Sequence, residues 1–221
     1  YRAKAGSRAR FEVFDQAMHD DIRARLELEN DLRHAIERDE FELHYQPLVS
    51  MSTGELQGFE ALLRWRHPSR GLVSPSMFIP IAEETGLIVQ LGRKALAGAC
   101  AQLREWQRRF PQLESLSVSV NLSVKQLTDP ALIQKIESTV ASTGIRPGTL
   151  KLEITESAIM DDLDAMRRLL SQLKKLNVQL WMDDFGTGYS SLSCLHQFPF
   201  DGIKIDRSFI RSMNERHELT A

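Results

Sequence analysis

The alternation of apolar and polar residues along the chain predicts six strands separated by helices. The strands are expected at residues 43–49, 56–63, 116–121, 150–155, 178–183 and 202–206. Apolar residues spaced by three or four predict helices over 87–110, 129–143 and 161–176, and a charged surface or linking helix over 20–40. Strands that alternate with helices favour an α/β fold with a mainly parallel sheet.

Five of these strands carry one apolar face and one polar face. In LKLEI, for example, Leu150, Leu152 and Ile154 share one face and Lys151 and Glu153 the other. Strands of a parallel sheet are usually apolar on both faces. A (β/α)8 barrel explains the difference, because helices cover the apolar faces and the polar residues line the lumen.

The polar faces bring together side chains suited to a hard cation. The converging set is Glu60, Asn121, Glu153, Asp183, Asp184, Lys204 and Asp206. Oxygen ligands favour Mg²⁺ or Mn²⁺, and so many carboxylates would repel one another without a cation. Two such ions would clamp a phosphodiester, with Asp183 bridging them and Asp184 serving the second. Lys204 would orient or deprotonate water, or neutralise developing charge.

Each of these residues also has a simpler explanation. A single acid at a strand end is more often a solvated cap or an ion-pair partner. Lys204 and Asp206 could form a structural ion pair, and Asn121 could bond to a turn. Arg64 could contact phosphate or belong to a solvated turn. The repetition of polar positions over five strands is what favours a site.

Composition narrows the class of protein further. The chain has 221 residues, 42% hydrophobic and 26% charged, with a formal net charge of -2. This predicts a globular domain with no general attraction for nucleic acid or anionic membrane. Cys100 and Cys194 have no metal-ligand spacing, which favours a reducing compartment and no structural zinc. No run of residues is long and apolar enough to predict a membrane span.

Five motifs in order resemble the EAL-domain family of cyclic di-GMP phosphodiesterases. They are GFEALLRW around Glu60, NLS at Asn121, LEITES, DDFGTGYSSL and GIKID. The resemblance runs from about Leu32 to Asp206. It implies a TIM-like (β/α)8 barrel with an antiparallel first strand, and hydrolysis of cyclic di-GMP to linear pGpG with two Mg²⁺ or Mn²⁺ ions.

The resemblance also implies roles for individual residues. Glu60, Asn121, Glu153 and Asp183 match ligands of the first metal, and Asp184 a ligand of the second. Lys204 matches the water-activating lysine and Asp206 its acidic neighbour. Gln46 and Arg64 match substrate contacts. Glu156 matches a glutamate that braces the loop after Asp184, and the loop at 185–195 is linked in the family to dimerisation and switching.

The two ends of the chain carry expectations of their own. Residues 1–15 resemble the end of a GGDEF domain, residues 16–31 are expected to be a linker helix, and residues 32–221 the EAL domain. The family continues with two more strands, so the barrel is expected to be truncated after the sixth. One of them supplies the remaining ligand of the second metal. The parent is expected to be an active phosphodiesterase, whereas the activity of residues 1–221 alone is left open.

Three functions follow from these patterns. The leading one is a metal-dependent cyclic di-GMP phosphodiesterase. A non-catalytic cyclic di-GMP receptor and a regulatory module that uses the loop at 185–195 are the alternatives. The expected partners are cyclic di-GMP, upstream GGDEF and sensory domains, and a second copy of the chain through that loop, without nucleic acid or membrane contact by this segment. A cytoplasmic location is expected, with any membrane attachment through upstream segments of the parent.

Overall fold

The computed structural model describes residues 16–159, 162–187 and 198–209. The strands are β1 (Phe41–Val49), β2 (Leu56–His67), β3 (Gly71–Val73), β4 (Ser117–Leu122), β5 (Leu150–Thr155), β6 (Gln179–Phe185) and β7 (Gly202–Ile205). The helices are α1 (Gln16–Glu37), α2 (Pro75–Thr85), α3 (Ile88–Arg109), α4 (Val124–Leu127), α5 (Leu132–Thr143), α6 (Glu156–Ile159) and α7 (Leu163–Lys174), with a short 3-10 helix at Pro111–Leu113.

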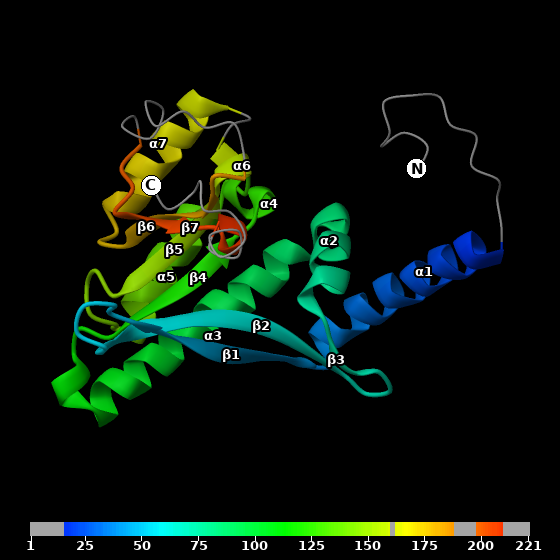
Figure 1. The fold of residues 1–221 in the computed structure, drawn as a ribbon, viewed down its shortest axis with the longest axis horizontal. Coiled ribbons are helices and arrows are strands. Elements are labelled where there is room, and N and C mark those ends of the chain that lie inside the picture. The colour runs from blue at the N-terminus through cyan, green and yellow to red at the C-terminus, as the bar shows by residue number, and fades with distance from the viewer. Residues whose placement is uncertain (1–15, 160–161, 188–197, 210–221) are drawn as a thin grey trace, which may run out of the picture.

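One mixed sheet carries the fold, in the order β1-β2-β4-β5-β6-β7 (Figure 1). β1 is antiparallel to β2, and the four following pairs are parallel. The short strand β3 folds back on the end of β2. This is the strand direction expected from the sequence, including the antiparallel first strand, and β1 and β7 are the outer strands of the described sheet.

The apolar face of the sheet packs against helices. Val118, Leu152 and Leu180 project from successive strands and are fully buried. They share one core with residues of α3, α5 and α7, among them Leu103, Ile136, Leu170 and Leu173. Each buried leucine or isoleucine stabilises the fold by about 1.5–3 kcal/mol. On β7, however, Ile203 and Ile205 are exposed, because that strand lies at the edge of the described sheet.

A second core joins α1 to the far end of β2. Leu28, Leu32 and Ala35 of α1 are buried in one cluster with Trp65 and Phe78. Figure 1 shows α1 extending away from the sheet beyond this contact. The helix runs without interruption from Gln16 to Glu37, so the division between a linker over 16–31 and a domain from residue 32 remains a prediction. The predicted GGDEF remnant, residues 1–15, lies outside the described residues.

All six predicted strands are present. The structure also contains elements that the sequence pattern does not predict, namely β3 and α2 within residues 71–85, the short helices α4 and α6, and the 3-10 helix at Pro111–Leu113. Helix α2 begins with Pro75 and contains Pro80, and an internal proline normally argues against a helix. Among the described helices, none combines the length and the apolar character that a bilayer span requires.

Candidate active site

The strand register brings the predicted polar residues to one end of the sheet. Asn121 of β4 lies beside Glu153 of β5, and Thr155 of β5 lies beside Asp183 of β6. Glu60 lies on β2, which pairs with β4. Because the carboxyl ends of parallel strands meet at the same edge, the side chains on the lumen face converge there.

Lys204 of β7 is the centre of this cluster. Its Nζ donates hydrogen bonds to Glu60 Oε2 at 3.0 Å and to Glu153 Oε2 at 2.6 Å. The same nitrogen lies 3.4 Å from Asp183 Oδ1. With Asn121 of β4, five strands contribute to one cation-centred group. It is called the Lys204 cluster below and comprises Glu60, Asn121, Glu153, Asp183 and Lys204.

Asn121 completes the cluster from β4. Its Nδ2 donates a hydrogen bond to Glu60 Oε1 at 2.9 Å. This bond leaves the amide oxygen of Asn121 available as a further oxygen donor. The arrangement thus supplies three carboxylates and one amide oxygen at the same strand ends.

Burial and charge shift the pKa values within the cluster. Glu153 is only 2% exposed, and this burial raises its pKa, an effect that the nearby charge of Lys204 opposes and that of Glu60 reinforces. For Lys204, burial lowers the pKa, but the charges of Glu153, Glu60 and Asp183 outweigh it and raise the pKa above the usual lysine range. The lysine is therefore a firmly protonated ammonium in this arrangement.

Asp184 is the second-last residue of β6 and lies just before the turn in which it was expected. Its backbone has a φ of 54°, a left-handed conformation that is uncommon for residues other than glycine. The pKa of its carboxyl is raised by partial burial and then by the negative charges of Asp183 and Asp206. Asp184 forms no hydrogen bond to the Lys204 cluster through its side chain among the described residues.

Asp206 has a local partner instead of Lys204. Its Oδ1 accepts a hydrogen bond from the Ser208 backbone N–H at 2.9 Å, and hydrogen bonding to Ser208 lowers its pKa. Among the described ion pairs, Lys204 bonds to other acids. The structural Lys204–Asp206 ion pair considered from the sequence is therefore not the arrangement that the fold adopts.

Glu156 connects β5 to the turn after Asp184. It is the first residue of α6 and is 1% exposed. Its Oε2 accepts a hydrogen bond from the Gly186 N–H at 2.8 Å. The contact is the one that a brace for this loop would need. Its functional role, and that of the predicted loop at 185–195, remain predictions, and residues 188–195 lie outside the described ranges.

The two predicted substrate contacts lie beside the cluster. Gln46 on β1 pairs with Glu60 across the antiparallel strands and is exposed. Arg64 lies four residues after Glu60 on the same face of β2, and its Nη1 donates to the Leu63 carbonyl at 2.9 Å. Arg64 also lines a hollow of about 300 Å³ together with Asn121 and Thr155.

Helix α2 contributes to this hollow through residues that the sequence reading missed. Ile79 and Glu83 lie on its wall. The available signal was Phe78, Ile81 and Ala82, which are spaced as a helix requires and are all buried. The two prolines of this segment obscured that signal.

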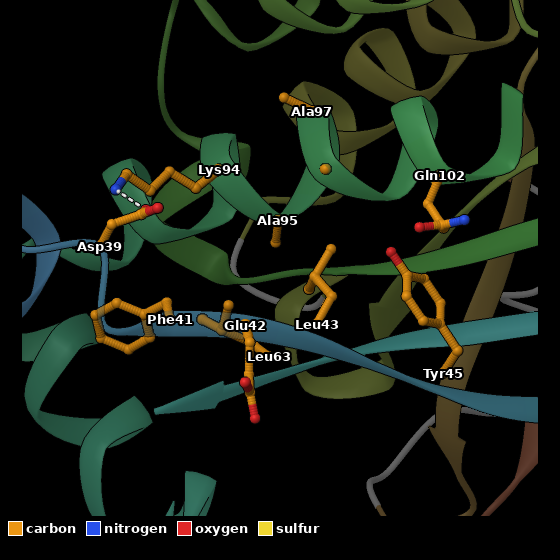
Figure 2. A pocket seen from close by; sticks show the side chains of 11 residues that line it. Asp39, Phe41, Glu42, Leu43, Tyr45, Leu63, Lys94, Ala95, Ala97 and Gln102 are labelled. Atoms are coloured by element: carbon orange, nitrogen blue, oxygen red, sulfur yellow. Dashed lines mark hydrogen bonds and ion pairs between the residues drawn. The ribbon is translucent and has the colours of Figure 1, made fainter. Parts of the chain in front are cut away.

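A second hollow, of about 490 Å³, lies between β1 and α3, away from the predicted residues. Figure 2 shows the Lys94–Asp39 ion pair at one end and Tyr45 and Gln102 at the other. The Lys94 Nζ–Asp39 Oδ1 distance is 2.9 Å. Its lining contains none of the predicted catalytic, metal-binding or substrate-binding residues.

The donor set fits a hard divalent cation by its chemistry. The carboxylates of Glu60, Glu153 and Asp183 and the amide oxygen of Asn121 are ligand types that Mg²⁺ and Mn²⁺ prefer. The Lys204 ammonium shows that these acids accommodate a positive charge. In the described part of the chain, no three Asp, Glu, His or Cys side chains are already arranged to bind a metal.

Comparison with known proteins places the chain in a family. A family model described as the EAL domain matches residues 29–221. An uncharacterized signalling protein of Caulobacter vibrioides is 47% identical over the whole chain, which spans 27% of that protein. The bifunctional diguanylate cyclase/cyclic di-GMP phosphodiesterase MucR of Pseudomonas aeruginosa is 42% identical over 96% of the chain, which spans 31% of MucR.

A solved structure agrees with the sequence comparison. The MucR phosphodiesterase in complex with cyclic di-GMP superposes with a TM-score of 0.83 at 42% identity, covering 88% of this chain and 78% of that one. The chain spans about a quarter to a third of the length of these curated relatives. The α/β, TIM-like barrel class with an antiparallel first strand is confirmed. The chain belongs to the EAL domain family.

Proposed function

We propose that this domain hydrolyses cyclic di-GMP to linear pGpG in a metal-dependent reaction. The observation that carries the proposal is the Lys204 cluster at the carboxyl ends of the strands. In it three carboxylates surround one ammonium, and the Asn121 amide donates a hydrogen bond to one of them. The relative MucR bears the name of a cyclic di-GMP phosphodiesterase, and its phosphodiesterase structure contains cyclic di-GMP. Both support the same substrate here.

Four residues of the Lys204 cluster, together with Asp184, would hold the cations. Glu60, Asn121, Glu153 and Asp183 are the proposed ligands of a first Mg²⁺ or Mn²⁺, and Asp183 and Asp184 those of a second. Such ions polarise a phosphodiester and lower the pKa of bound water. The crowding of acids around Glu153, whose pKa burial already raises, supports a requirement for positive charge at this place.

Lys204 would act mainly as a charged hydrogen-bond donor. The neighbouring carboxylates raise its pKa, so it holds its proton at neutral pH and can orient water or stabilise negative charge on the phosphate. In the proposed reaction a water oxygen attacks phosphorus, the P–O3′ bond breaks and the 3′ oxygen takes up a proton. Gln46 and Arg64 are the proposed substrate contacts, and Asp206 and Glu156 the residues that support the site.

The site is tested by separating cyclic di-GMP from pGpG chromatographically after incubation with Mg²⁺ or Mn²⁺. We expect turnover in the unaltered chain and a loss of about 100-fold or more in Asp183→Asn. Asp201→Asn is the matched control, because Asp201 lies near the amino end of β7 and pairs with Lys174. Equal turnover in Asp183→Asn would contradict the proposal, and binding without turnover in the unaltered chain would indicate a receptor.

The surrounding biology is part of the proposal. We propose that the domain acts in the cytoplasm, with upstream GGDEF and sensory domains in a longer parent. A homodimer through the loop at 185–195 remains a prediction.

A further inference from the structure

Ser119 carries a buried hydroxyl group beside the Lys204 cluster. The residue lies on β4 two positions before Asn121, so both side chains project from the lumen face of the sheet. Glu60 is its partner on β2, and Glu153, which pairs with Asn121, lies diagonally across on β5. Ser119 therefore lies between the two glutamates of the cluster.

The hydroxyl of Ser119 lacks a partner. Only 1% of the residue is exposed, and its Oγ is the one buried side-chain oxygen or nitrogen of the described ranges that forms no hydrogen bond. A hydroxyl that has lost water without gaining a partner is unfavourable, and the large majority of buried polar groups in proteins are hydrogen-bonded. The position therefore points to a hydrogen bond that forms in another state of the site.

The Glu153 carboxylate has the matching acceptor. Its Oε2 accepts a hydrogen bond from Lys204 Nζ at 2.6 Å, whereas its Oε1 accepts none from the residues that the structure describes. Glu60, by contrast, uses both of its oxygens, one with Asn121 and the other with Lys204.

Ser119 is near enough to reach that acceptor. Burial raises the pKa of Glu153, and the neighbouring Ser119 hydroxyl lowers it, although no pair of their oxygen atoms has hydrogen-bond geometry. Rotation about the Cα–Cβ bond of Ser119 changes the direction of the hydroxyl without moving the strand. The unused donor and the unused acceptor can therefore pair in place.

We propose that Ser119 is a positioning residue, whose hydroxyl donates to Glu153 Oε1 when Glu153 Oε2 exchanges the Lys204 ammonium for a divalent cation. The inference rests on the proposed function, because it takes Glu153 as a metal ligand. A carboxylate that is held at one oxygen presents the other in a fixed direction, and metal-binding carboxylates are usually hydrogen-bonded in this way. Ser119 itself contacts neither the metal nor the substrate.

Ser117 provides a matched control on the same strand. It lies two residues before Ser119 on the same face and is also buried. Its hydroxyl, however, already donates to the Gln57 carbonyl at 3.1 Å. The substitution of serine by alanine therefore removes an unused hydroxyl at position 119 and a hydrogen-bonded one at position 117.

The first measurement is Mn²⁺ binding without nucleotide, followed by the electron paramagnetic resonance signal of the free ion. Ser119→Ala should weaken Mn²⁺ binding about 10- to 100-fold, which is the usual loss when a partner of a metal ligand is removed. Ser117→Ala should bind Mn²⁺ as tightly as the unaltered chain.

The second measurement separates positioning from a structural role. In urea unfolding with EDTA, Ser119→Ala should be at least as stable as the unaltered chain, because it removes a buried hydroxyl without a partner. Ser117→Ala should unfold at a lower urea concentration, since it loses the hydrogen bond to Gln57. A structural role of Ser119 would lower stability and leave Mn²⁺ affinity unchanged.

The third measurement is the Mn²⁺ dependence of cyclic di-GMP hydrolysis. Ser119→Ala should need about 10- to 100-fold more Mn²⁺ for half of its maximal rate. At saturating Mn²⁺ its rate should return to within a few-fold of the unaltered chain, because Ser119 does not touch the substrate. Unchanged Mn²⁺ affinity in Ser119→Ala, or a loss of stability in EDTA equal to that of Ser117→Ala, would overturn the proposal.

The outcome is separable from that of the proposed function. Mn²⁺ binding that depends on Ser119, without hydrolysis of cyclic di-GMP, would overturn the hydrolase and leave the role of Ser119 standing. Hydrolysis with equal Mn²⁺ affinities in the unaltered chain and in Ser119→Ala would overturn only the role of Ser119. An unaltered chain that binds no Mn²⁺ would overturn both.

Discussion

Two lysines on the lumen face of the same sheet have opposite environments. Lys204 lies among the carboxylates of the Lys204 cluster, which raise its pKa. Lys151 lies two residues before Glu153 on β5, toward the amino end. Its Nζ is 4.7 Å from the centroid of the Trp181 ring, and burial lowers its pKa against the weaker opposing effect of Glu153. Lysine thus forms ion pairs at the carboxyl end of the sheet and packs against an aromatic ring at the amino end.

The packing at the amino end depends on a close approach. The Trp181 ring lies across Gly202 of the neighbouring strand, where an added Cβ would come within 2.7 Å of the ring. Trp181 Nε1 also donates to Gln179 Oε1 at 3.1 Å. Lys151, Trp181 and Gln179 therefore interact with one another within the chain. At the carboxyl end three carboxylates surround a single ammonium. This difference supports the proposal that the chemistry takes place at that end.

The largest effect should come from removing the ammonium. Lys204→Met leaves three carboxylates without their cation, so in EDTA we expect the free energy of unfolding to fall by about 2–3 kcal/mol. The loss is smaller than for a fully buried pair, because the Lys204 side chain is 26% exposed. Urea denaturation measures it. Lys174→Met, which breaks the more exposed ion pair with Asp201, should lower the free energy of unfolding by less than about 1 kcal/mol. Equal losses in both variants would contradict the difference proposed between the two ends of the sheet.

The carboxyl end should also depend on the brace from Glu156. Removing the acceptor of the Gly186 N–H should loosen the turn that follows Asp184, so Glu156→Ala should lower turnover about 10-fold. In Glu156→Ala, hydrogen exchange at the Gly186 amide should be faster than in the unaltered chain when it is measured well below the melting midpoint. Glu156→Gln should restore part of the protection from exchange. Unchanged exchange in Glu156→Ala would show that the loop is held by other contacts.

Strand parity explains why the Lys204 cluster could be anticipated from the sequence. Side chains of a strand alternate between its two faces, so Glu153 and Lys151, which are two residues apart, lie on the same face however the strand packs. The same rule cannot say that Lys204 would bond to Glu60 and Glu153 and leave Asp206 to Ser208, because that choice depends on register and side-chain conformation.

Helix α2 shows the other limit. Its two prolines hid a short helix between recognisable motifs, and with it the position of Glu83. Which of two adjacent glutamates faces a hollow depends on how the helix packs against α1 and α3, and no local pattern specifies this.

Lowering the pH should reduce the loss in the free energy of unfolding that Lys204→Met causes. A carboxyl whose pKa is raised on folding stabilises the fold at low pH, and this contribution is lost as the pH rises through the raised pKa. Without the ammonium, the pKa of Glu153 should rise further, so lowering the pH from 7 toward the ordinary glutamate pKa of about 4.3 should return more stability to the variant than to the unaltered chain. Unfolding measured in EDTA across this range checks the sign, and a gap that widens on acidification would contradict it.

The smallest effect is expected from Lys151→Met. The substitution keeps an apolar stem against Trp181 and removes a partly desolvated charge, so it loses only a cation–π contact worth about 0.5–1 kcal/mol. The free energy of unfolding should change by less than about 1 kcal/mol. A loss as large as that of Lys204→Met would mean that the amino end is also governed by charge.

The most direct test of the account compares the two lysines in catalysis. Cyclic di-GMP hydrolysis with Mg²⁺ is measured for the unaltered chain, Lys204→Ala and Lys151→Ala under identical conditions. The account predicts that Lys204→Ala lowers kcat by about 10²- to 10⁴-fold, while Lys151→Ala stays within a few-fold of the unaltered chain. Turnover at the unaltered rate in Lys204→Ala, or equal losses in both variants, would contradict the assignment of the chemistry to the carboxyl end.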